Sequence, residues 1–220
     1  MQQRDLFGNI VYEDDRKSVS PEAARYPDEA WVNTSSLNGL NDGICTCMKC
    51  PLGQTRTNFV FGVGNPHADV MFIGEAPGAD EDVQGEPFVG KAGQLLNKIL
   101  AAVALTREEV YICNILKCRP PNNRDPLPSE METCTPYLQK QIDLIKPKFI
   151  ICLGRISAQW LLQTNASLTS LRGRTHDYSG AKLIVTYHPA ALLRNPNWKR
   201  PAWEDMKMFR QLYDNAKSGA

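Results

Sequence analysis

Short apolar runs alternate with amphipathic segments along most of the chain after about residue 68. Four runs of mainly apolar residues predict buried strands, because a strand covered on both faces has no polar side. These runs are residues 70–73, 110–112, 149–153 and 183–186. Segments with apolar residues at helical spacing lie between and after them, at residues 90–105, 129–145, 154–162 and 202–216. We expect the second of these helices to begin with a capping box formed by Ser129 and Glu132.

This alternation predicts an α/β fold: a three-layer α/β/α sandwich around a central, mainly parallel four-stranded sheet. In such sheets, binding sites form at the carboxyl ends of the strands. Three candidate segments directly follow predicted strands, namely the loop GEAPG at residues 74–78, Asn114 and His188. Topology therefore predicts that the three segments meet at one edge of the sheet. His67 and His176 lie in polar sequence, and we expect both on surface loops.

Residues 1–40 differ from the rest of the chain in charge and pattern. They carry 4 basic and 7 acidic side chains, whereas residues 41–220 carry 21 basic and 17 acidic ones. Because no periodic element is visible in residues 1–40, we expect a flexible N-terminal tail there and one domain over residues 41–220. The mild positive charge of that domain permits binding to nucleic acid without requiring it.

The apolar runs also bear on location. None approaches the roughly 18 residues that a membrane helix needs. The first residues lack the apolar stretch of a secretory signal. We therefore expect a cytoplasmic monomer that does not contact a membrane.

The chain contains seven cysteines, an odd number that argues against a disulfide framework. Cys47 and Cys50 form a CxxC pair, and Cys118 and Cys134 follow without partners at that spacing. Four thiolates suit either zinc or an iron–sulfur cluster, and the lack of a second CxxC pair favours the cluster. Cys45 could replace Cys47 as a ligand. The cysteines inside predicted strands are expected to be core residues, and these are Cys113 and Cys152.

Four motifs stand in order along the chain: GEAPG (74–78) with ED (81–82), GEPFVGKAGQLL (85–96), NILKCRPP (114–121) with NR (123–124), and HPAALLRNP (188–196). Together with the cysteines they resemble the family 4 uracil-DNA glycosylases, the iron–sulfur branch of the uracil-DNA glycosylase superfamily. The resemblance covers about residues 45–213. The branch that traps DNA covalently has Gln where Ala76 stands and an inserted basic loop that is missing here, so the resemblance points away from it.

The resemblance implies a monofunctional DNA glycosylase that flips uracil out of DNA and hydrolyses its N-glycosidic bond. The product would be an abasic site for base excision repair, and the partner would be uracil-containing DNA, single- or double-stranded. The resemblance also implies a [4Fe–4S] cluster with a structural role at one side of the sheet, with zinc as the alternative. The implied ligands are Cys47, Cys50, Cys118 and Cys134.

The same resemblance assigns roles to three pocket residues. His188 would donate a hydrogen bond to a uracil oxygen, which needs only a neutral imidazole. Phe88 would stack on the flipped base. Asn114 would recognise the Watson–Crick edge of uracil, because a carboxamide offers both a donor and an acceptor.

Two acidic residues in and after the 74–78 loop each have two alternative roles. Glu75 and Glu81 are the candidates that could act on the attacking water, since no aspartate stands in the 74–78 loop. Glu81 could instead organise its loop, and Glu75 could shape the base pocket together with Ala76.

The resemblance also implies contacts with DNA. Leu192, four residues after His188, would wedge into the gap left by the flipped base, with a buried core leucine as the alternative. Basic side chains near the motifs would contact phosphates, and these are Arg194, Lys91, Arg124, Lys117 and Arg119. Lys117 and Arg119 flank a proposed cluster ligand and could instead act on the cluster.

Three other functions fit parts of the pattern. An iron–sulfur electron carrier or structural module would explain the cysteines without catalysis. A phosphate-handling α/β enzyme would use the 74–78 loop, but GxxxxGK[ST] is missing and Pro77 has no N–H to donate. A third possibility keeps the fold but changes the base, to hypoxanthine, xanthine or mismatched thymine.

Overall fold

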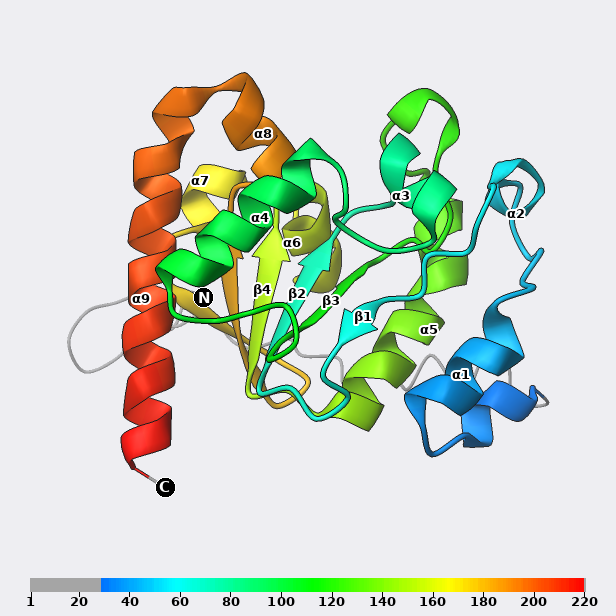
Figure 1. The fold of residues 1–220 in the computed structure, drawn as a ribbon, viewed down its shortest axis with the longest axis horizontal. Coiled ribbons are helices and arrows are strands. Elements are labelled where there is room, and N and C mark those ends of the chain that lie inside the picture. Colours follow the sequence, from blue (N-terminus) through cyan, green and yellow to red (C-terminus); the bar gives the residue numbers. More distant parts are fainter. Residues whose placement is uncertain (1–28, 220) are drawn as a thin grey trace, which may run out of the picture.

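The computed structural model describes residues 29–219, which contain a six-stranded sheet. The strand order is β1-β3-β2-β4-β6-β5; the four central strands are parallel, and both outer pairs are antiparallel. The strands are β1 (Val63–Gly64), β2 (Val70–Gly74), β3 (Tyr111–Asn114), β4 (Phe149–Leu153), β5 (Thr175–Tyr178) and β6 (Ala181–Thr186). In Figure 1 the arrowheads of β2 and β4 point to the same edge of the sheet.

Helices cover both faces of this sheet. They are η2 (Ala30–Asn33), α1 (Leu37–Ile44), α2 (Leu52–Thr55), α3 (Ala79–Gln84), α4 (Lys91–Ala102), η3 (Pro121–Asn123), α5 (Pro128–Ile145), α6 (Arg155–Leu161), α7 (Leu168–Leu171), α8 (Pro189–Arg194), η4 (Pro196–Trp198) and α9 (Lys199–Ser218). None of the helices within residues 29–219 combines the length and the apolar character needed to cross a bilayer.

Alternate residues of a strand face opposite sides of its sheet, and β2 shows the consequence. Val70 and Phe72 belong to a hydrophobic cluster with residues of α4 and α9. Met71 and Ile73 belong to a second cluster, with residues of α1, α5 and α6. The predicted α/β/α layering is therefore present, with α4 and α9 on one side of the strands and α1 and α5 on the other (Figure 1).

All four predicted strands are present, as β2, β3, β4 and β6, but the predicted count of four is wrong. The two additional strands lie at the edges of the sheet. β1 has only two residues, and β5 alternates exposed and half-buried side chains. An edge strand is less covered than a central one and does not need a continuous apolar run. His176, which we expected in a loop, lies in β5.

The expectation of a tail over residues 1–40 is wrong for its last part, and residues 1–28 lie outside the described residues. Trp31 of η2 and Leu40 of α1 are buried. The Trp31 ring packs edge-on against Tyr137 of α5, with 4.9 Å between the ring centroids. Leu37, Leu40 and Ile44 stand at helical spacing, but this pattern crosses the expected boundary at residue 40 and is visible only over residues 37–44 as a whole.

The start of α5 also differs from the prediction. The helix begins at Pro128, and its capping carboxylate is Glu130 rather than Glu132. Glu130 accepts a hydrogen bond from the Leu127 N–H at 2.8 Å. Proline is favoured at the first helical position, where its missing N–H costs nothing, and this position puts residue 130 three residues after the cap.

Candidate active site

A cavity of about 700 Å³ opens at the carboxyl edge of the parallel strands. Its lining includes the loop after β2, Asn114 at the end of β3, and His188 two residues after β6. Gly74 and Asn114 are register partners in adjacent strands, so the first two segments meet directly. The three segments selected from the sequence therefore share one cavity, whereas their chemical roles stay predictions.

Asn114 has an unusual environment. The residue is 2% exposed, and its Oδ1 is the one buried side-chain oxygen or nitrogen within residues 29–219 that has no hydrogen-bond partner. A Cβ at Gly74 would lie 2.3 Å from this oxygen, so only glycine leaves room for it. Burying a polar atom without a partner costs free energy, and Asn114 is one of the residues that line the cavity, so a bound ligand is the candidate source of the missing donor.

His188 caps α8 and is oriented by that role. Its Nδ1 accepts a hydrogen bond from the Ala190 N–H at 3.1 Å. Burial, and then the charge of Arg194, lowers the pKa of His188 to about 4. The ring is therefore neutral at pH 7, and with Nδ1 acting as acceptor the proton lies on Nε2. His188 can donate from Nε2 without carrying a charge.

Phe88 provides an aromatic wall of the same cavity. It is 5% exposed, and its ring centroid lies 5.5 Å from that of His188, with 31° between the planes. Its φ of +56° lies in the left-handed region, which a phenylalanine adopts only when the surroundings impose it. A Cβ at Gly74 would meet Phe88 Cζ at 2.8 Å, and a Cβ at Gly93 would lie 1.7 Å from the Phe88 carbonyl oxygen.

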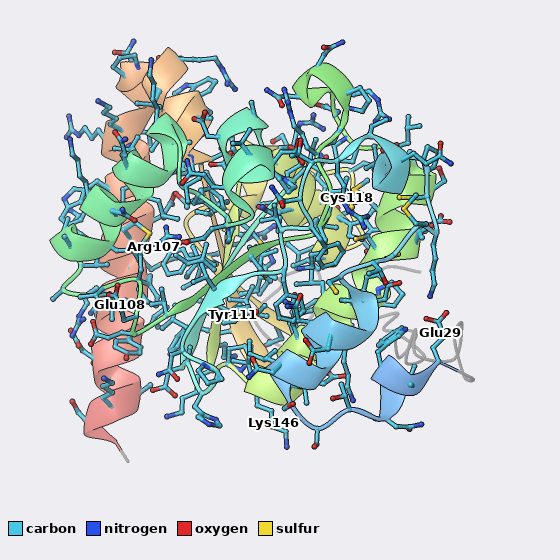
Figure 2. The ribbon with its side chains drawn as sticks, turned by 45° about the vertical axis from the view of Figure 1, so that its right-hand side comes forward. Glu29, Arg107, Glu108, Tyr111, Cys118 and Lys146 are labelled. Atoms are coloured by element: carbon cyan, nitrogen blue, oxygen red, sulfur yellow. The ribbon has the colours of Figure 1, made fainter. Side chains whose placement is uncertain are left out.

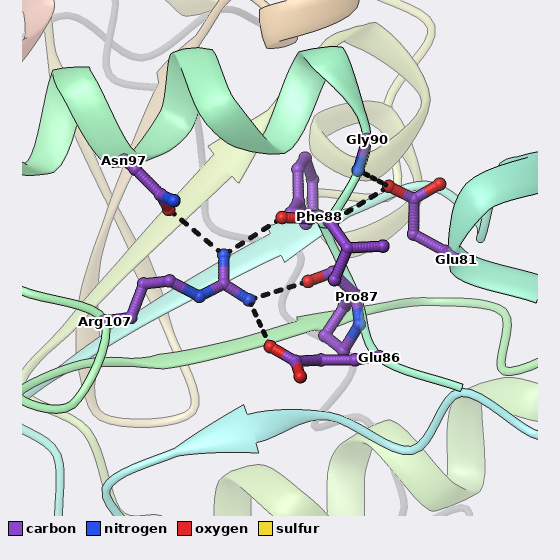
Figure 3. Close-up of polar contacts among 8 residues, drawn as sticks. Glu81, Glu86, Pro87, Phe88, Gly90, Asn97 and Arg107 are labelled. Carbon is purple, nitrogen blue, oxygen red and sulfur yellow. Dashed lines mark hydrogen bonds and ion pairs between the residues drawn. The ribbon is translucent and has the colours of Figure 1, made fainter. Parts of the chain in front are cut away.

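Two charged side chains hold the segment around Phe88 from opposite sides (Figure 3). Arg107 donates to the carbonyl oxygens of Pro87 at 2.8 Å and Phe88 at 3.1 Å, and it pairs with Glu86 at 3.0 Å. Glu81 accepts from the N–H groups that follow Phe88. Thus a cation binds the carbonyls and an anion binds the amides, and together they fix the strained backbone.

The contacts of Glu81 distinguish between its two expected roles. One carboxylate oxygen accepts from the N–H groups of Val89 at 3.0 Å and Gly90 at 3.1 Å. The other accepts from the N–H of Gly78 at 3.1 Å. With both oxygens bonded to the main chain, Glu81 organises two loops, and this geometry favours that role over activation of water. The Gly78 N–H is also already occupied, which argues against a phosphate site in this loop.

Of the two candidate carboxylates, Glu75 is the one that is not bonded to main-chain amides as Glu81 is. It lines the cavity, half-buried, together with Ala76. Burial, and then the nearby charge of Asp125, raises its pKa to about 7, while Arg155 acts in the opposite direction. A carboxyl group with such a pKa can exchange a proton near neutral pH.

The residues expected to contact DNA have different positions. Leu192 is 2% exposed, so the prediction of a wedge at this position is wrong and its alternative, a core leucine, is observed. Leu193 beside it is 45% exposed. Arg194 is exposed and lines the cavity, and Lys91 is exposed at the start of α4. Arg124 also lines the cavity, but it pairs with the buried carboxylate of Glu130 at 2.6 Å.

Lys117 cannot contact a phosphate, because it is fully buried. Its ammonium group donates to the Asn114 carbonyl oxygen at 2.8 Å and to Gln141 Oε1 at 2.6 Å. Arg119 is half-buried and donates to Asn123 at 2.8 Å. Through this bond to its carbonyl oxygen, Lys117 holds the main chain of Asn114 in place.

Electrostatic interactions link the four cysteines predicted as ligands, one of which, Cys118, is labelled in Figure 2. Burial raises the pKa of Cys118 to about 11, and Cys50 and Cys47 also raise it. Burial raises the pKa of Cys134 to about 12, with further contributions from Cys118 and Cys50. Cys45 instead contacts the carbonyl of Asp42, at 3.7 Å. Within residues 29–219, three or more His, Cys, Asp or Glu side chains nowhere form a group that could hold a metal ion.

Hydrogen-bond donors reach three of these four sulfur atoms. Each of these three sulfurs receives one hydrogen bond, and the donors come from separate segments of the chain. The pairs are Arg56 with Cys118 at 3.3 Å, the Tyr137 hydroxyl with Cys47 at 3.2 Å, and the Lys117 N–H with Cys134 at 3.4 Å. Cys113 and Cys152, expected to be core residues, are fully buried in β3 and β4.

Several residues around the cavity could not be found from the sequence. Arg107 lies in an ordinary charged segment, TREE at 106–109, with no motif to single it out. Tyr187 and Trp198 line the cavity, and Trp198 lies just after the last motif. Tyr187 directly precedes His188, so its position next to a motif could have been noted from the sequence. Its contact with Trp198 depends on the folded chain.

Comparison with known proteins identifies similar sequences over most of the chain. The model of the Uracil DNA glycosylase superfamily matches residues 61–207. The type-4 uracil-DNA glycosylase of Archaeoglobus fulgidus is 45% identical over 185 residues, which are 80% of this chain and 93% of the relative.

Two further relatives have the same printed name. The type-4 uracil-DNA glycosylase of Sulfurisphaera tokodaii is 46% identical over 186 residues, covering 80% of this chain and 84% of the relative. That of Thermotoga maritima is 44% identical over 158 residues, covering 71% and 82%.

Proposed function

Because the chain belongs to the uracil DNA glycosylase superfamily and, within it, to the type-4 uracil-DNA glycosylases, we infer that it removes uracil from DNA by hydrolysing the N-glycosidic bond. The cavity at the strand ends is the place where a flipped nucleotide would be bound. The observation that carries this assignment is the unpaired Oδ1 of Asn114.

Asn114 would select uracil by hydrogen bonding. Its buried Oδ1 lacks a donor, and uracil offers a ring N–H beside a carbonyl. Cytosine has an unprotonated ring nitrogen at that place, so the two acceptors would face each other and stay unpaired. The fixed main chain helps, because the Lys117 ammonium group holds the Asn114 carbonyl.

His188 would stabilise the departing base. As the glycosidic bond lengthens, negative charge develops on the uracil ring and positive charge on the sugar. The Nδ1 contact with the Ala190 N–H leaves Nε2–H as the donor, and the low pKa keeps the ring neutral. A neutral donor stabilises the uracilate without transferring a proton.

Phe88 would hold the base flat between the loop after β2 and His188. Its position is fixed before substrate binds, by Arg107 on its own carbonyl and by Glu81 on the N–H of the next residue, Val89 (Figure 3). Such preorganisation matters, because the left-handed backbone conformation of Phe88 costs free energy, and that cost is met in folding rather than when substrate binds.

Glu75 is our candidate for the group that orients and deprotonates water. It lines the cavity, and its carboxyl oxygens are not committed to main-chain amides as those of Glu81 are. With a pKa raised to about 7, half of it is ionised at neutral pH. The neighbouring Ala76 would form the pocket wall.

A [4Fe–4S] cluster on Cys47, Cys50, Cys118 and Cys134 is part of the proposal. The mutual effects of these thiols on pKa and the three donors that reach their sulfurs support it. A single ion would need several ligands in one tight group, whereas each iron of a cluster is bound by one thiolate. The cluster would hold the chain around residues 47–50 against α5, and we assign it no chemical step.

DNA would approach over the rim of the cavity. Arg194, at the cavity, and Lys91, at the start of α4, are exposed and could contact phosphates. On α8, Leu193 rather than Leu192 is the exposed apolar side chain that could enter the stack of bases. A monomeric state and a cytoplasmic location stay predictions.

Release of free uracil from a uracil-containing oligonucleotide tests the function. We expect release from uracil and no strand cleavage, with no release from a matched thymine oligonucleotide. An electron carrier or structural module would release nothing with its cluster intact. Faster release of hypoxanthine, xanthine or mismatched thymine would instead reassign the base.

A further inference from the structure

Trp198 lies at the rim of the uracil cavity without a role in the chemistry described above. It lines the cavity with His188 and Arg194, and 40% of it is exposed. An indole left in water forgoes the free energy of burial that its large apolar surface could provide. Its position beside the site therefore calls for a ligand that covers it.

The indole is held in place rather than free to rotate. Trp198 ends η4, whose turn is closed by its own N–H donating to the Asn195 carbonyl at 3.2 Å. The Asn195 side chain accepts from the Asn197 N–H, also at 3.2 Å. The indole stacks on the ring of Tyr187, with 5.1 Å between centroids and 15° between planes.

Tyr187 is in turn supported from the core. The guanidinium of Arg172 lies 4.3 Å from the centroid of the Tyr187 ring. Arg172 pairs with the buried carboxylate of Asp205 at 2.7 Å, and the Thr186 hydroxyl donates to the same carboxylate at 2.7 Å. The cation, the phenol and the indole form a stack that begins at a buried ion pair and ends at an exposed ring.

Basic side chains lie next to Trp198 in the sequence. Lys199 and Arg200 follow it, and Arg194 lies four residues before it at the end of α8, all exposed. An aromatic face combined with basic groups is the combination by which proteins bind single-stranded nucleic acid, since bases stack on the ring and phosphates meet the cations.

We propose that Trp198 is a stacking subsite for the unpaired nucleobase next to the uracil in single-stranded DNA. This inference rests on the proposed function, because it places uracil in the cavity that Trp198 borders. The ring of Trp198 takes the base and the stack behind it keeps that ring flat. In a duplex the neighbouring base already stacks inside the helix, so the subsite acts mainly on single strands.

The test uses three variants, of which two make the same substitution at different positions. Trp198→Leu removes the indole at the cavity, and Trp203→Leu removes an equally exposed indole, also 40%, that lines two neighbouring cavities and not the uracil cavity. Trp198→Phe restores a smaller aromatic face. Each is assayed for uracil release under single-turnover conditions over a range of enzyme concentrations, and each is checked by thermal melting.

The substrates complete a double-mutant cycle. One single strand has ordinary nucleotides around its uracil, and others have an abasic analogue in place of the neighbour on one side, on the other side or on both. We expect Trp198→Leu to raise the half-saturating enzyme concentration about tenfold on the ordinary strand. The maximal rate should change less than about twofold, because stacking next to the uracil contributes to ground-state binding.

On the strand without neighbours, Trp198→Leu should match wild type, as should Trp203→Leu on every substrate, and Trp198→Phe should recover most of the lost affinity. The loss on duplex substrate should be smaller than on the single strand. An equal loss with and without neighbours, an equal loss on duplex, or no loss at all would overturn the inference. Uracil release by the wild type in the same assay keeps these results separate from a failure of the proposed function.

Discussion

The guanidinium of Arg107 donates to the main-chain carbonyl of Phe88 at 3.1 Å, although the two residues are 19 positions apart. It binds the carbonyl of Pro87 as well, so two consecutive carbonyls are fixed by one side chain. Glu81 fixes the following amides. The aromatic wall of the cavity therefore depends on an arginine that does not line it (Figure 3).

Replacing Arg107 should slow catalysis only by changing the position of Phe88. In Arg107→Gln we expect the single-turnover rate to fall about 10- to 100-fold, because small misplacements at an active site cost that much. Arg210→Gln is the matched control. Arg210 also donates to two main-chain carbonyls, those of Val103 and Ala104, and pairs with Asp214, but away from the cavity.

The control decides the interpretation. Both substitutions should lower the melting temperature by similar amounts, and only the first should change the rate. Arg107→Lys keeps the positive charge but not the bidentate donor geometry of the guanidinium, so it should recover part of the rate. If the two glutamine variants had the same rate, Arg107 would be a structural residue and not a positioning residue.

Removing the two polar groups of the base pocket should abolish most of the acceleration. We expect His188→Ala to lower the single-turnover rate about 100- to 1,000-fold, the usual effect of losing one donor to a developing anion. Asn114→Ala should lower it about as much, because it removes the carboxamide that pairs with the edge of uracil and leaves that edge unpaired. DNA binding, measured by fluorescence anisotropy, should change little. Wild-type rates in both variants would mean that the site has been wrongly assigned.

The rate should depend on pH through Glu75. Its pKa is raised to about 7, so below that pH the carboxyl is protonated and cannot act as a base. The rate should therefore rise about tenfold per pH unit below 7 and level off above it. His188, with a pKa of about 4, stays neutral over this range and adds no second limb.

Glu75→Gln should be slow and nearly independent of pH between about pH 6 and 8. The carboxamide is close in size and cannot titrate, so this variant separates ionisation from shape. A pH profile identical to that of the wild type would assign the titration to another group.

Loss of one cluster ligand should be visible directly. Cys118→Ser should lose the visible absorbance and the iron of the purified protein, since thiolates are the ligands of such clusters. Cys152→Ser is the control, because Cys152 is equally a buried cysteine but lies in β4. Cys45→Ser should also keep its iron. Zinc in the wild-type protein, or unchanged iron in Cys118→Ser, would contradict the ligand assignment.

Neighbouring leucines on α8 should have opposite phenotypes. Leu192 is buried, so Leu192→Ala should lower the free energy of unfolding by about 2–5 kcal/mol. Leu193 is exposed, so Leu193→Ala should leave the melting temperature unchanged and slow uracil release from duplex DNA several-fold. Urea unfolding and duplex kinetics measure the two effects. Reversed phenotypes would restore Leu192 as the wedge.

The apolar runs were enough to determine the four central strands and their parallel arrangement. A strand buried on both faces needs an unbroken apolar run, and the site of a parallel sheet follows from where such strands end. Asn114 and His188 could thus be found as candidates that meet in one cavity. The edge strands β1 and β5 could not be found, because a short or partly exposed strand has no such pattern.

Only the tertiary structure decided what surrounds those candidates. Whether Leu192 or Leu193 faces solvent depends on how α8 packs on the rest of the protein. The spacing of residues within a motif carries no information about that packing. The bonding of Glu81 to amides, the support of Phe88 by Arg107, and the stack of Trp198 on Tyr187 join residues that no single helix, strand or turn brings together. A motif records residues that are neighbours in sequence, whereas burial and hydrogen bonds depend on neighbours in space.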